Sequence, residues 1–297
     1  MSSSSTGNSR GPDGAPETSP DVGSTADRRA PSLARSRKVK VGHEVVCERL
    51  FRPLAHLIVL VLVPFRVPPP LVAAAAGATG VVAAVELAQG RFLLAALLVQ
   101  LKTVLDNADG QLARLSGRIT PFGRYLDSEL DLLVNAALFA ALGWVSGQPV
   151  LAAVGFVALT SVLNANFNVE RLYRAEHGDP RSPMPETRGR VDGLLRGLYV
   201  LVYAPQDRLV ERSIEWRLRA ADPQARRAYH DRATVTVLAN LGMSTQLLAF
   251  GICAALGRPA VFAWIALAEL AFVVCLFLRR ELLLRSVART AVDSAAA

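Results

Sequence analysis

The chain has 297 residues, of which 52% are hydrophobic, and it carries a net charge of +8 at pH 7. Its three cysteines, Cys47, Cys253 and Cys275, show no CxxC spacing and no nearby histidine cluster, which argues against a disulfide framework or a zinc site. The mean hydropathy of +0.31 and the grouping of apolar residues in blocks indicate a multi-span membrane protein. The basic excess therefore favours an anionic membrane surface as the partner, and no nucleic acid.

The N-terminal part of the chain changes character near residue 38. Residues 1–38 are rich in Ser, Gly, Pro and charge, so we expect a disordered tail. It is not a signal peptide, because no apolar core follows the start. Within 39–66, apolar residues recur at helical spacing among charged ones, before an apolar run that is shorter than the roughly 20 residues a bilayer requires. This segment predicts an amphipathic helix that lies in the headgroup region.

Six longer apolar segments follow and predict six transmembrane helices, so the expected fold is an all-α integral membrane domain over 67–285. The segments lie at 70–88, 92–113, 121–146, 148–171, 233–256 and 259–279. The charged stretch at about 175–232 is predicted to be a cytoplasmic insertion on the membrane surface. Residues 286–297 are expected to form a short C-terminal tail.

Arginine and lysine are distributed unevenly between the two sides of this layout. Six spans place both termini, the 114–120 loop and the Arg-rich stretch 172–232 on one side. The short connections on the other side carry only Arg91 and Arg258. Because loops rich in Lys and Arg remain in the cytoplasm, the basic side with both termini is predicted to be cytoplasmic. The Ala- and Arg-rich composition hints at a bacterial cytoplasmic membrane.

Four aspartates lie at the cytoplasmic ends of the second and third predicted spans. They are Asp106, Asp109, Asp127 and Asp131. Residues three or four apart share a helical face, so each span carries two carboxylates on one stripe. A short turn joins the two spans, which makes them antiparallel neighbours whose stripes can face each other across a cleft. The active site is therefore expected on the cytoplasmic side.

The clustering of these carboxylates predicts a metal centre. A central Asp costs about 2.5–3.5 kcal/mol even on the lower insertion scale. Protonation would remove one or two charges, whereas two divalent cations would balance all four. Oxygen ligands favour Mg²⁺ or Mn²⁺, and a pair of such ions can clamp a phosphoryl group. The alternative interpretation is two helix ends with solvated carboxylates.

The same stretch resembles the signature of the CDP-alcohol phosphatidyltransferase family, D-x2-D-G-x2-A-R-x8-G-x3-D-x3-D. All eight fixed positions match, at Asp106, Asp109, Gly110, Ala113, Arg114, Gly123, Asp127 and Asp131. The resemblance implies that the four aspartates hold the metal pair and that Asp131 also takes the proton from the acceptor hydroxyl. The three small residues would accommodate the nucleotide, and Arg114 would stabilise the site or its phosphates.

The resemblance further implies transfer of a phosphatidyl group from CDP-diacylglycerol to an alcohol or alcohol phosphate in phospholipid biosynthesis, with release of CMP. It also suggests a homodimer. Within the same class, a soluble CDP-alcohol could be the donor and a lipid or sugar-alcohol phosphate the acceptor. From another class, a non-catalytic transporter could use the carboxylates as an ion path.

Three basic residues near the motif have competing interpretations. Arg171 and Arg174 share a helical face at the end of the fourth span and could bind an acceptor phosphate. Arginines at a cytoplasmic helix end are, however, already expected from the orientation. Lys102 lies one turn before Asp106, where a local ion pair is at least as good an interpretation as a catalytic role.

Overall fold

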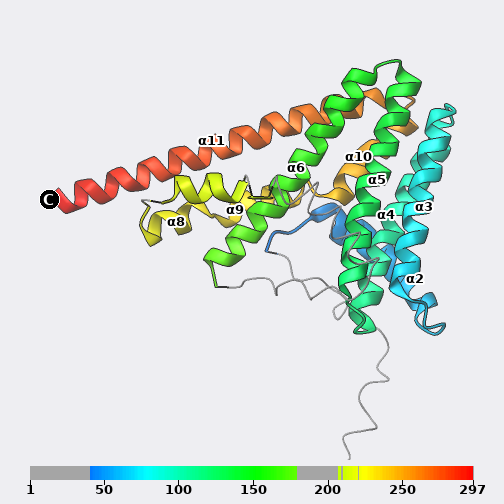
Figure 1. The fold of residues 1–297 in the computed structure, drawn as a ribbon, viewed down its shortest axis with the longest axis horizontal. Helices are drawn as coiled ribbons and strands as arrows, with labels where there is room; N and C mark the ends of the chain where they lie inside the picture. The colour runs from blue at the N-terminus through cyan, green and yellow to red at the C-terminus, as the bar shows by residue number, and fades with distance from the viewer. Residues whose placement is uncertain (1–40, 179–206, 209, 220, 297) are drawn as a thin grey trace, which may run out of the picture. The chain divides into compact units, whose positions relative to one another are not determined.

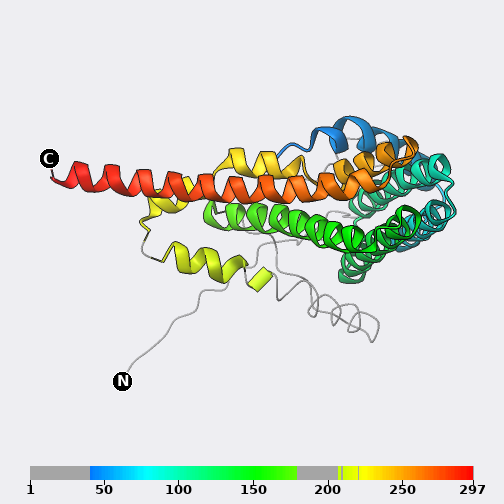
Figure 2. The ribbon, with the colours of Figure 1, turned by 90° about the horizontal axis from the view of Figure 1, so that it is seen from above.

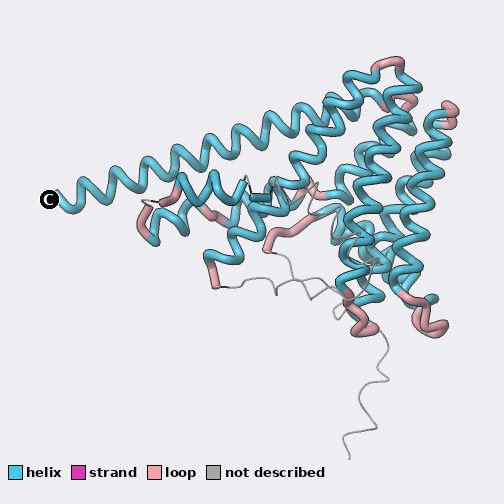
Figure 3. The backbone as a smooth tube through the Cα atoms, viewed as in Figure 1, coloured by secondary structure: helices cyan, strands magenta, loops and turns pink. Residues whose placement is uncertain are grey.

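A computed structural model describes residues 41–178, 207–208, 210–219 and 221–296, and the predicted tail 1–38 lies outside them. The described residues are helices joined by short connections, with no strand among them (Figures 1 and 3). All of them belong to one compact unit, 32–297. The all-α fold class is thus confirmed. The helices are η1 (Cys47–Phe51), α2 (Arg52–Leu62), α3 (Pro69–Ala88), α4 (Phe92–Leu115), α5 (Pro121–Ser146), α6 (Pro149–Glu176), α8 (Pro223–Tyr229), α9 (Arg232–Ala239), α10 (Met243–Ala255) and α11 (Ala260–Ala296).

Five helical segments in the described part of the chain are long and apolar enough to cross a membrane. They are Pro69–Ala88, Tyr125–Ser146, Pro149–Glu176, Pro223–Ala255 and Ala260–Leu282. The chain is therefore an integral membrane protein. The predicted span 92–113 does form a helix, α4, but its charged residues Lys102, Asp106 and Asp109 exclude it from this set. The count of six spans stays a prediction.

Proline and capping residues determine where several helices begin. Pro69, Pro121 and Pro149 each occupy the first turn of α3, α5 and α6, where a missing N–H costs nothing. At α5 the Thr120 hydroxyl also accepts a hydrogen bond from the Gly123 amide, at 3.1 Å. Gly147, with φ 67°, ends the same helix in the left-handed conformation that glycine tolerates. The helix that carries two of the four aspartates thus has well-defined ends.

Glycines on α3 bring α5 unusually close. A Cβ added at Gly80 would lie 2.6 Å from Cγ1 of Val134, and one at Gly77 would lie 2.8 Å from Cδ2 of Leu130. Small residues at a helix interface allow such an approach, and in membranes this close packing is a main source of helix association. Because Leu130 and Val134 flank Asp131 on α5, the α3 glycines determine where that carboxylate lies.

The predicted fifth span, 233–256, is two helices rather than one. α9 ends at Ala239 and α10 begins at Met243, with Gly242 as its extended N-cap. Asn240 occupies the break: its Nδ2 donates to the His43 carbonyl at 2.8 Å, and its Oδ1 accepts from the Val45 amide at 3.0 Å. A side chain at Gly242 would collide with Glu44, since an added Cβ would lie 2.8 Å from Oε1. Contacts with residues 43–45 therefore favour the break.

The N-terminal helical stretch buries a stripe that repeats every four residues, and Ala55 and Val59 of this stripe pack with Ala108 and Leu112 of α4. Its members are Cys47, Phe51, Ala55 and Val59. The opposite side of α2 is also apolar, since Leu54, Leu57 and Val61 are exposed. Polar and charged residues are concentrated at the start of the stretch, where Arg52 and His56 lie one turn apart. The amphipathic character of this segment stays a prediction. Its position in the headgroup region stays a prediction.

The last helix extends beyond its apolar part. α6 packs against the first part of α11 (Figure 2), and the two helices diverge toward the end of α11 (Figure 1). α11 is helical to Ala296, through the predicted C-terminal tail. In the predicted insertion, much of which lies outside the described residues, Ile214 and Leu218 pack with Tyr229 of α8 against Leu284 of α11.

Candidate active site

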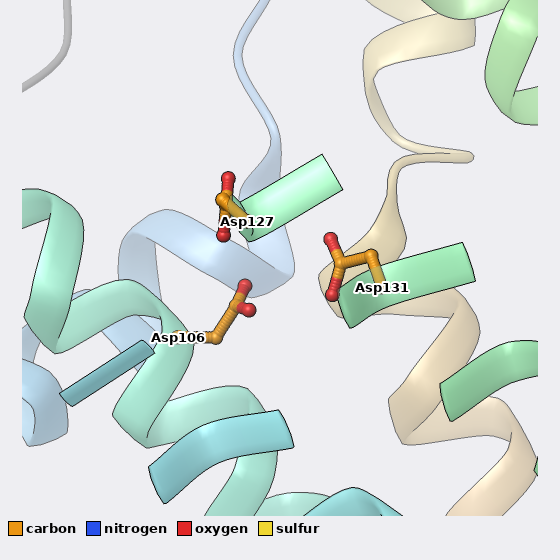
Figure 4. Close-up of side chains that lie close together, drawn as sticks. All are labelled: Asp106, Asp127 and Asp131. Atoms are coloured by element: carbon orange, nitrogen blue, oxygen red, sulfur yellow. The ribbon is translucent and has the colours of Figure 1, made fainter. Parts of the chain in front are cut away.

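Asp106 of α4 and Asp127 and Asp131 of α5 point toward one another (Figure 4). One carboxylate oxygen from each lies within 4.8 Å of the other two. Two of these residues are one turn apart on α5 and the third is on α4, so the cluster requires this register of the two helices. Three carboxylate oxygens so close together can share a divalent cation, for which oxygen ligands are typical.

Lys102 is the basic residue in direct contact with this cluster. Its Nζ donates to Oδ1 of Asp106 at 2.9 Å, one turn along α4, and to Oδ1 of Asp131 on the neighbouring helix. The side chain is only 2% exposed. The predicted local ion pair with Asp106 is present, and the structure adds the contact with Asp131. Lys102 therefore links α4 to α5 through the carboxylates.

The three aspartates line a cavity of about 420 Å³. Its other described walls come from the N-terminal stretch, from α6, from the insertion at Asp207, from the break before α10 at Gly242, and from Ser244 at the start of α10. The α6 wall presents Thr160, Asn164 and other residues at helical spacing. The cavity is thus built from segments far apart in the sequence, around the carboxylates.

Arg52 and Arg114 are the two cationic residues among the described lining residues. Arg52 is 6% exposed and contacts Oε1 of Glu48, at 3.4 Å. Its carbonyl accepts a hydrogen bond from Gln111 of α4 at 2.9 Å, which fixes the start of α2 over α4. An added Cβ at Gly110 would lie 3.3 Å from the Arg114 guanidinium, so this glycine gives that side chain room. The cavity therefore offers two guanidinium groups to a phosphate.

The other motif residues lie at different distances from the cluster. Asp109 is buried and lines the cavity, but it is not one of the three convergent carboxylates. Gly110 and Arg114 line the cavity, whereas Ala113 and Gly123 are not among its lining residues. Gly123 instead donates its amide to the cap of α5. The proposed nucleotide roles of these residues stay predictions.

The two α6 arginines contact carboxylates. Nη2 of Arg171 donates to Glu211 at 3.2 Å and to Asn168 at 3.1 Å. Arg174 is buried and its Nε donates to Glu170 at 3.1 Å. Neither arginine is among the residues that line the cavity. Arg171 therefore links α6 to Glu211 of the insertion, and Arg174 pairs with Glu170 one turn earlier on the same helix. Their predicted role in binding an acceptor phosphate stays a prediction.

Several site residues could not be identified from the sequence. The Asp131 contact of Lys102 depends on the register between α4 and α5. Arg52 comes from a segment expected only to rest on the membrane, and Asp207 from the insertion. One of these walls is marked in the sequence, because Gly242 in Asn240–Leu241–Gly242 interrupts an apolar run. Non-helical backbone inside a membrane domain is tolerated where it lines a cavity.

The fold and the carboxylate cluster together define an integral membrane protein with a candidate metal centre. Residues 66–187 match the family model described as CDP-alcohol phosphatidyltransferase. This segment of the chain, which holds α3 to α6 and all four aspartates, belongs to that family, so the predicted family is confirmed.

Three similar proteins share parts of this segment. The bifunctional IPC transferase and DIPP synthase of Thermococcus kodakarensis is 33% identical over 96 residues, which are 32% of this chain and 22% of that protein. The phosphatidylinositol phosphate synthase of Corynebacterium glutamicum is 35% identical over 95 residues, or 32% of this chain and 42% of that protein. The archaetidylinositol phosphate synthase of Aeropyrum pernix is 44% identical over 46 residues, or 16% of this chain and 24% of that protein. The chain therefore spans less than half the length of each.

Proposed function

We propose that this protein is a CDP-alcohol phosphatidyltransferase of phospholipid biosynthesis. It would transfer a phosphatidyl group from CDP-diacylglycerol to an alcohol or alcohol phosphate and release CMP. The convergence of Asp106, Asp127 and Asp131 on a cavity, within the segment that matches the family, is the observation that carries the proposal. Two of the similar proteins are a phosphatidylinositol phosphate synthase and an archaetidylinositol phosphate synthase, which favours inositol or an inositol phosphate as the acceptor.

The residues fit a divalent cation, Mg²⁺ or Mn²⁺. The convergent donors are carboxylate oxygens from three residues, and Asp109, the fourth aspartate of the motif, is buried at the same cavity. No thiol or imidazole belongs to the convergent group, which disfavours zinc or copper. When bound, a pair of such cations would neutralise the carboxylates and offset charge on the diphosphate of the donor.

Asp131 is our candidate for the base. It lines the cavity beside Asp106, and its Oδ1 accepts a hydrogen bond from Lys102, which holds the carboxylate in place. The acceptor hydroxyl would give its proton to Asp131 while its oxygen attacks the donor phosphorus distal to the cytidine. The bond from that phosphorus to the bridging oxygen breaks, and CMP leaves with the electron pair. Asp131 then returns the proton to solvent.

The guanidinium groups of Arg52 and Arg114 would bind the phosphates of the donor, because both line the cavity and both carry fixed positive charge. Gly110 beside Arg114 would allow the nucleotide to approach the backbone. Only Arg114 of this pair belongs to the family signature.

The setting of the reaction is part of the proposal. The aspartates lie toward the Arg-rich ends of α4 and α5, which supports an active site and both termini on the cytoplasmic side of a bacterial cytoplasmic membrane. Membrane lipids would supply the donor. The homodimer and the absence of a nucleic-acid partner stay predictions.

CMP release from purified protein in detergent tests the function. CDP-diacylglycerol with Mg²⁺ or Mn²⁺ would be combined with inositol, inositol phosphate, glycerol phosphate, serine or no acceptor. We expect release that requires one acceptor and the metal and is lost in Asp131→Asn. Glu86→Gln, at an ion pair with Arg91 on the opposite side, is the matched control and should retain activity.

The pattern of outcomes separates the alternatives. If no acceptor gives CMP release, CDP-diacylglycerol is refuted as the donor, and the assay would be repeated with soluble CDP-alcohols. If the soluble CDP-alcohols give no CMP release either, the enzymatic function is contradicted and the ion-path alternative is favoured. Release that persists in Asp131→Asn would refute the assignment of this residue as the base.

A further inference from the structure

Lys102 is the fully enclosed cation of the carboxylate cluster. Its ammonium contacts Asp106 on its own helix and Asp131 on α5, and its side chain is 2% exposed. Asp106 and Asp131 are also two of the three carboxylates that converge. The same oxygen-bearing groups that would hold a divalent cation are therefore already in contact with a positive charge of the protein.

We propose that Lys102 is a positioning residue that acts as the fixed counter-ion of this cluster. It holds Asp131 against α4, and it limits how tightly the site binds divalent cations. The part of the proposal that concerns turnover rests on the proposed function, whereas the part that concerns metal binding does not.

The charges lead to this assignment. Asp106, Asp127 and Asp131 bring three negative charges within a few ångströms of one another. The single positive charge of Lys102 pairs with two of them, Asp106 and Asp131. A divalent cation at the three carboxylates would lie close to the ammonium and would be repelled by it. The divalent cation must also share oxygen ligands with the ammonium. Both effects lower its affinity relative to a cluster without Lys102.

A purely structural ion pair would behave differently. A buried ion pair in itself is weak evidence for stability, and if this pair served only to link α4 to α5, its removal would loosen that side-chain link. A looser contact separates the carboxylates, which would weaken cation binding. The two interpretations therefore predict opposite changes in metal affinity when the positive charge is removed.

The test is direct Mn²⁺ binding to the full-length protein in detergent, without donor or acceptor. Free Mn²⁺ would be measured by electron paramagnetic resonance during a titration. We expect Lys102→Met, which keeps the length of the side chain and removes the charge, to bind Mn²⁺ about tenfold more tightly. Lys102→Arg retains the charge and should stay within about threefold of the wild type. Arg91→Met, which removes an exposed ion pair with Glu86, is the control and should not change Mn²⁺ binding.

Two further measurements keep the inference refutable. Lys102→Gln, whose amide can still donate to a carboxylate, replaces Lys102→Met if that variant does not fold, and it should also bind Mn²⁺ more tightly. At saturating Mn²⁺, CMP release by Lys102→Met should show a kcat lowered about tenfold or more and a donor KM within about threefold, because Asp131 has lost the donor that holds it. Equal or weaker Mn²⁺ binding in both neutral variants would overturn the counter-ion role. Unchanged kcat would overturn the positioning role.

Mn²⁺ binding and CMP release report on different properties of the protein. If the wild type releases no CMP but the neutral variants bind Mn²⁺ more tightly, the proposed function is wrong and the counter-ion role is supported. If the wild type releases CMP and the neutral variants bind Mn²⁺ no better, the counter-ion role is wrong and the proposed function is unaffected.

Discussion

Replacing Gly80 by alanine should disturb both the stability of the protein and its active site. The glycine lies on α3 opposite Val134 of α5, and an added Cβ would lie 2.6 Å and 2.7 Å from the two γ carbons of that valine. Carbon atoms prefer separations of about 3.5–4.0 Å, so the two helices must separate or the valine must rotate. Rotation is disfavoured, because a β-branched residue in a helix has one strongly preferred rotamer.

The expected loss of stability can be worked out from these contacts. Overpacking of a well-packed core costs about 1–3 kcal/mol. The better helix propensity of alanine offsets at most about 1 kcal/mol of this cost. Val134 is only 1% exposed, so no solvent-filled space can take up the displaced atoms. We expect Gly80→Ala to lower the free energy of unfolding by about 1–2 kcal/mol.

The assay combines thermal unfolding in detergent with CMP release. A displacement of α5 moves Asp131, which is three residues from Val134, and a shift of about 1 Å in a reacting group can cost about 10²-fold in rate. The double variant Gly80→Ala/Val134→Ala removes the two γ carbons and should recover much of both losses. The coupling between the two substitutions should be about 1 kcal/mol or more.

A Gly80→Ala protein as stable and as active as the wild type would refute the close α3–α5 contact. A double variant no better than the sum of the single variants would show that the γ carbons of Val134 are not the cause.

Three other outcomes are expected. Asp127→Asn keeps the size of the side chain but removes one of three convergent carboxylates, so CMP release should fall by about 10²-fold or more while the unfolding midpoint stays close to that of the wild type; near-normal release would contradict its role as a ligand. Chelation of divalent cations with EDTA should abolish CMP release, and added Mg²⁺ or Mn²⁺ should restore it; activity that survives thorough chelation would exclude a metal-dependent reaction. Asp231→Ala removes the cap of α9, whose carboxylate accepts from the Thr234 amide at 2.8 Å, and should lower stability by about 1 kcal/mol in thermal unfolding; Asp231→Asn is the control that retains a cap.

The positions of most helices follow from local chemistry that the sequence displays. Long apolar runs and a proline at the start indicate α3, α5 and α6, and Pro69, Pro121 and Pro149 lie within one residue of the predicted beginnings. The break between α9 and α10 was not predicted. Asn240 and Gly242 lie inside an apolar run, and their hydrogen bonds and close contacts involve residues 43–45, almost 200 positions earlier. Such long-range contacts cannot be obtained from local periodicity.

The active site was predictable in its composition and less so in its geometry. Spacing placed Asp106 and Asp109 on one stripe of α4, yet only Asp106 joins the convergent group, because the rotation of α4 against α5 decides which carboxylate faces the partner helix. Lys102 was identified as a neighbour of Asp106 by the four-residue spacing. Its contact with Asp131 depends on that same rotation.

The charged helix α4 has a consequence for how the protein enters the membrane. It packs against α2, α3 and α10, so these helices surround it in the folded protein. Lys102 and the two aspartates would make a lone α4 costly to insert, since such a residue costs about 2.5–3.5 kcal/mol at the centre of a spanning helix. We therefore expect α4 to insert poorly into the membrane as a single helix. It should stay near the insertion machinery until α5 is made and supplies the carboxylate of Asp131. In this view the residues that would perform the chemistry also impose an order on membrane assembly.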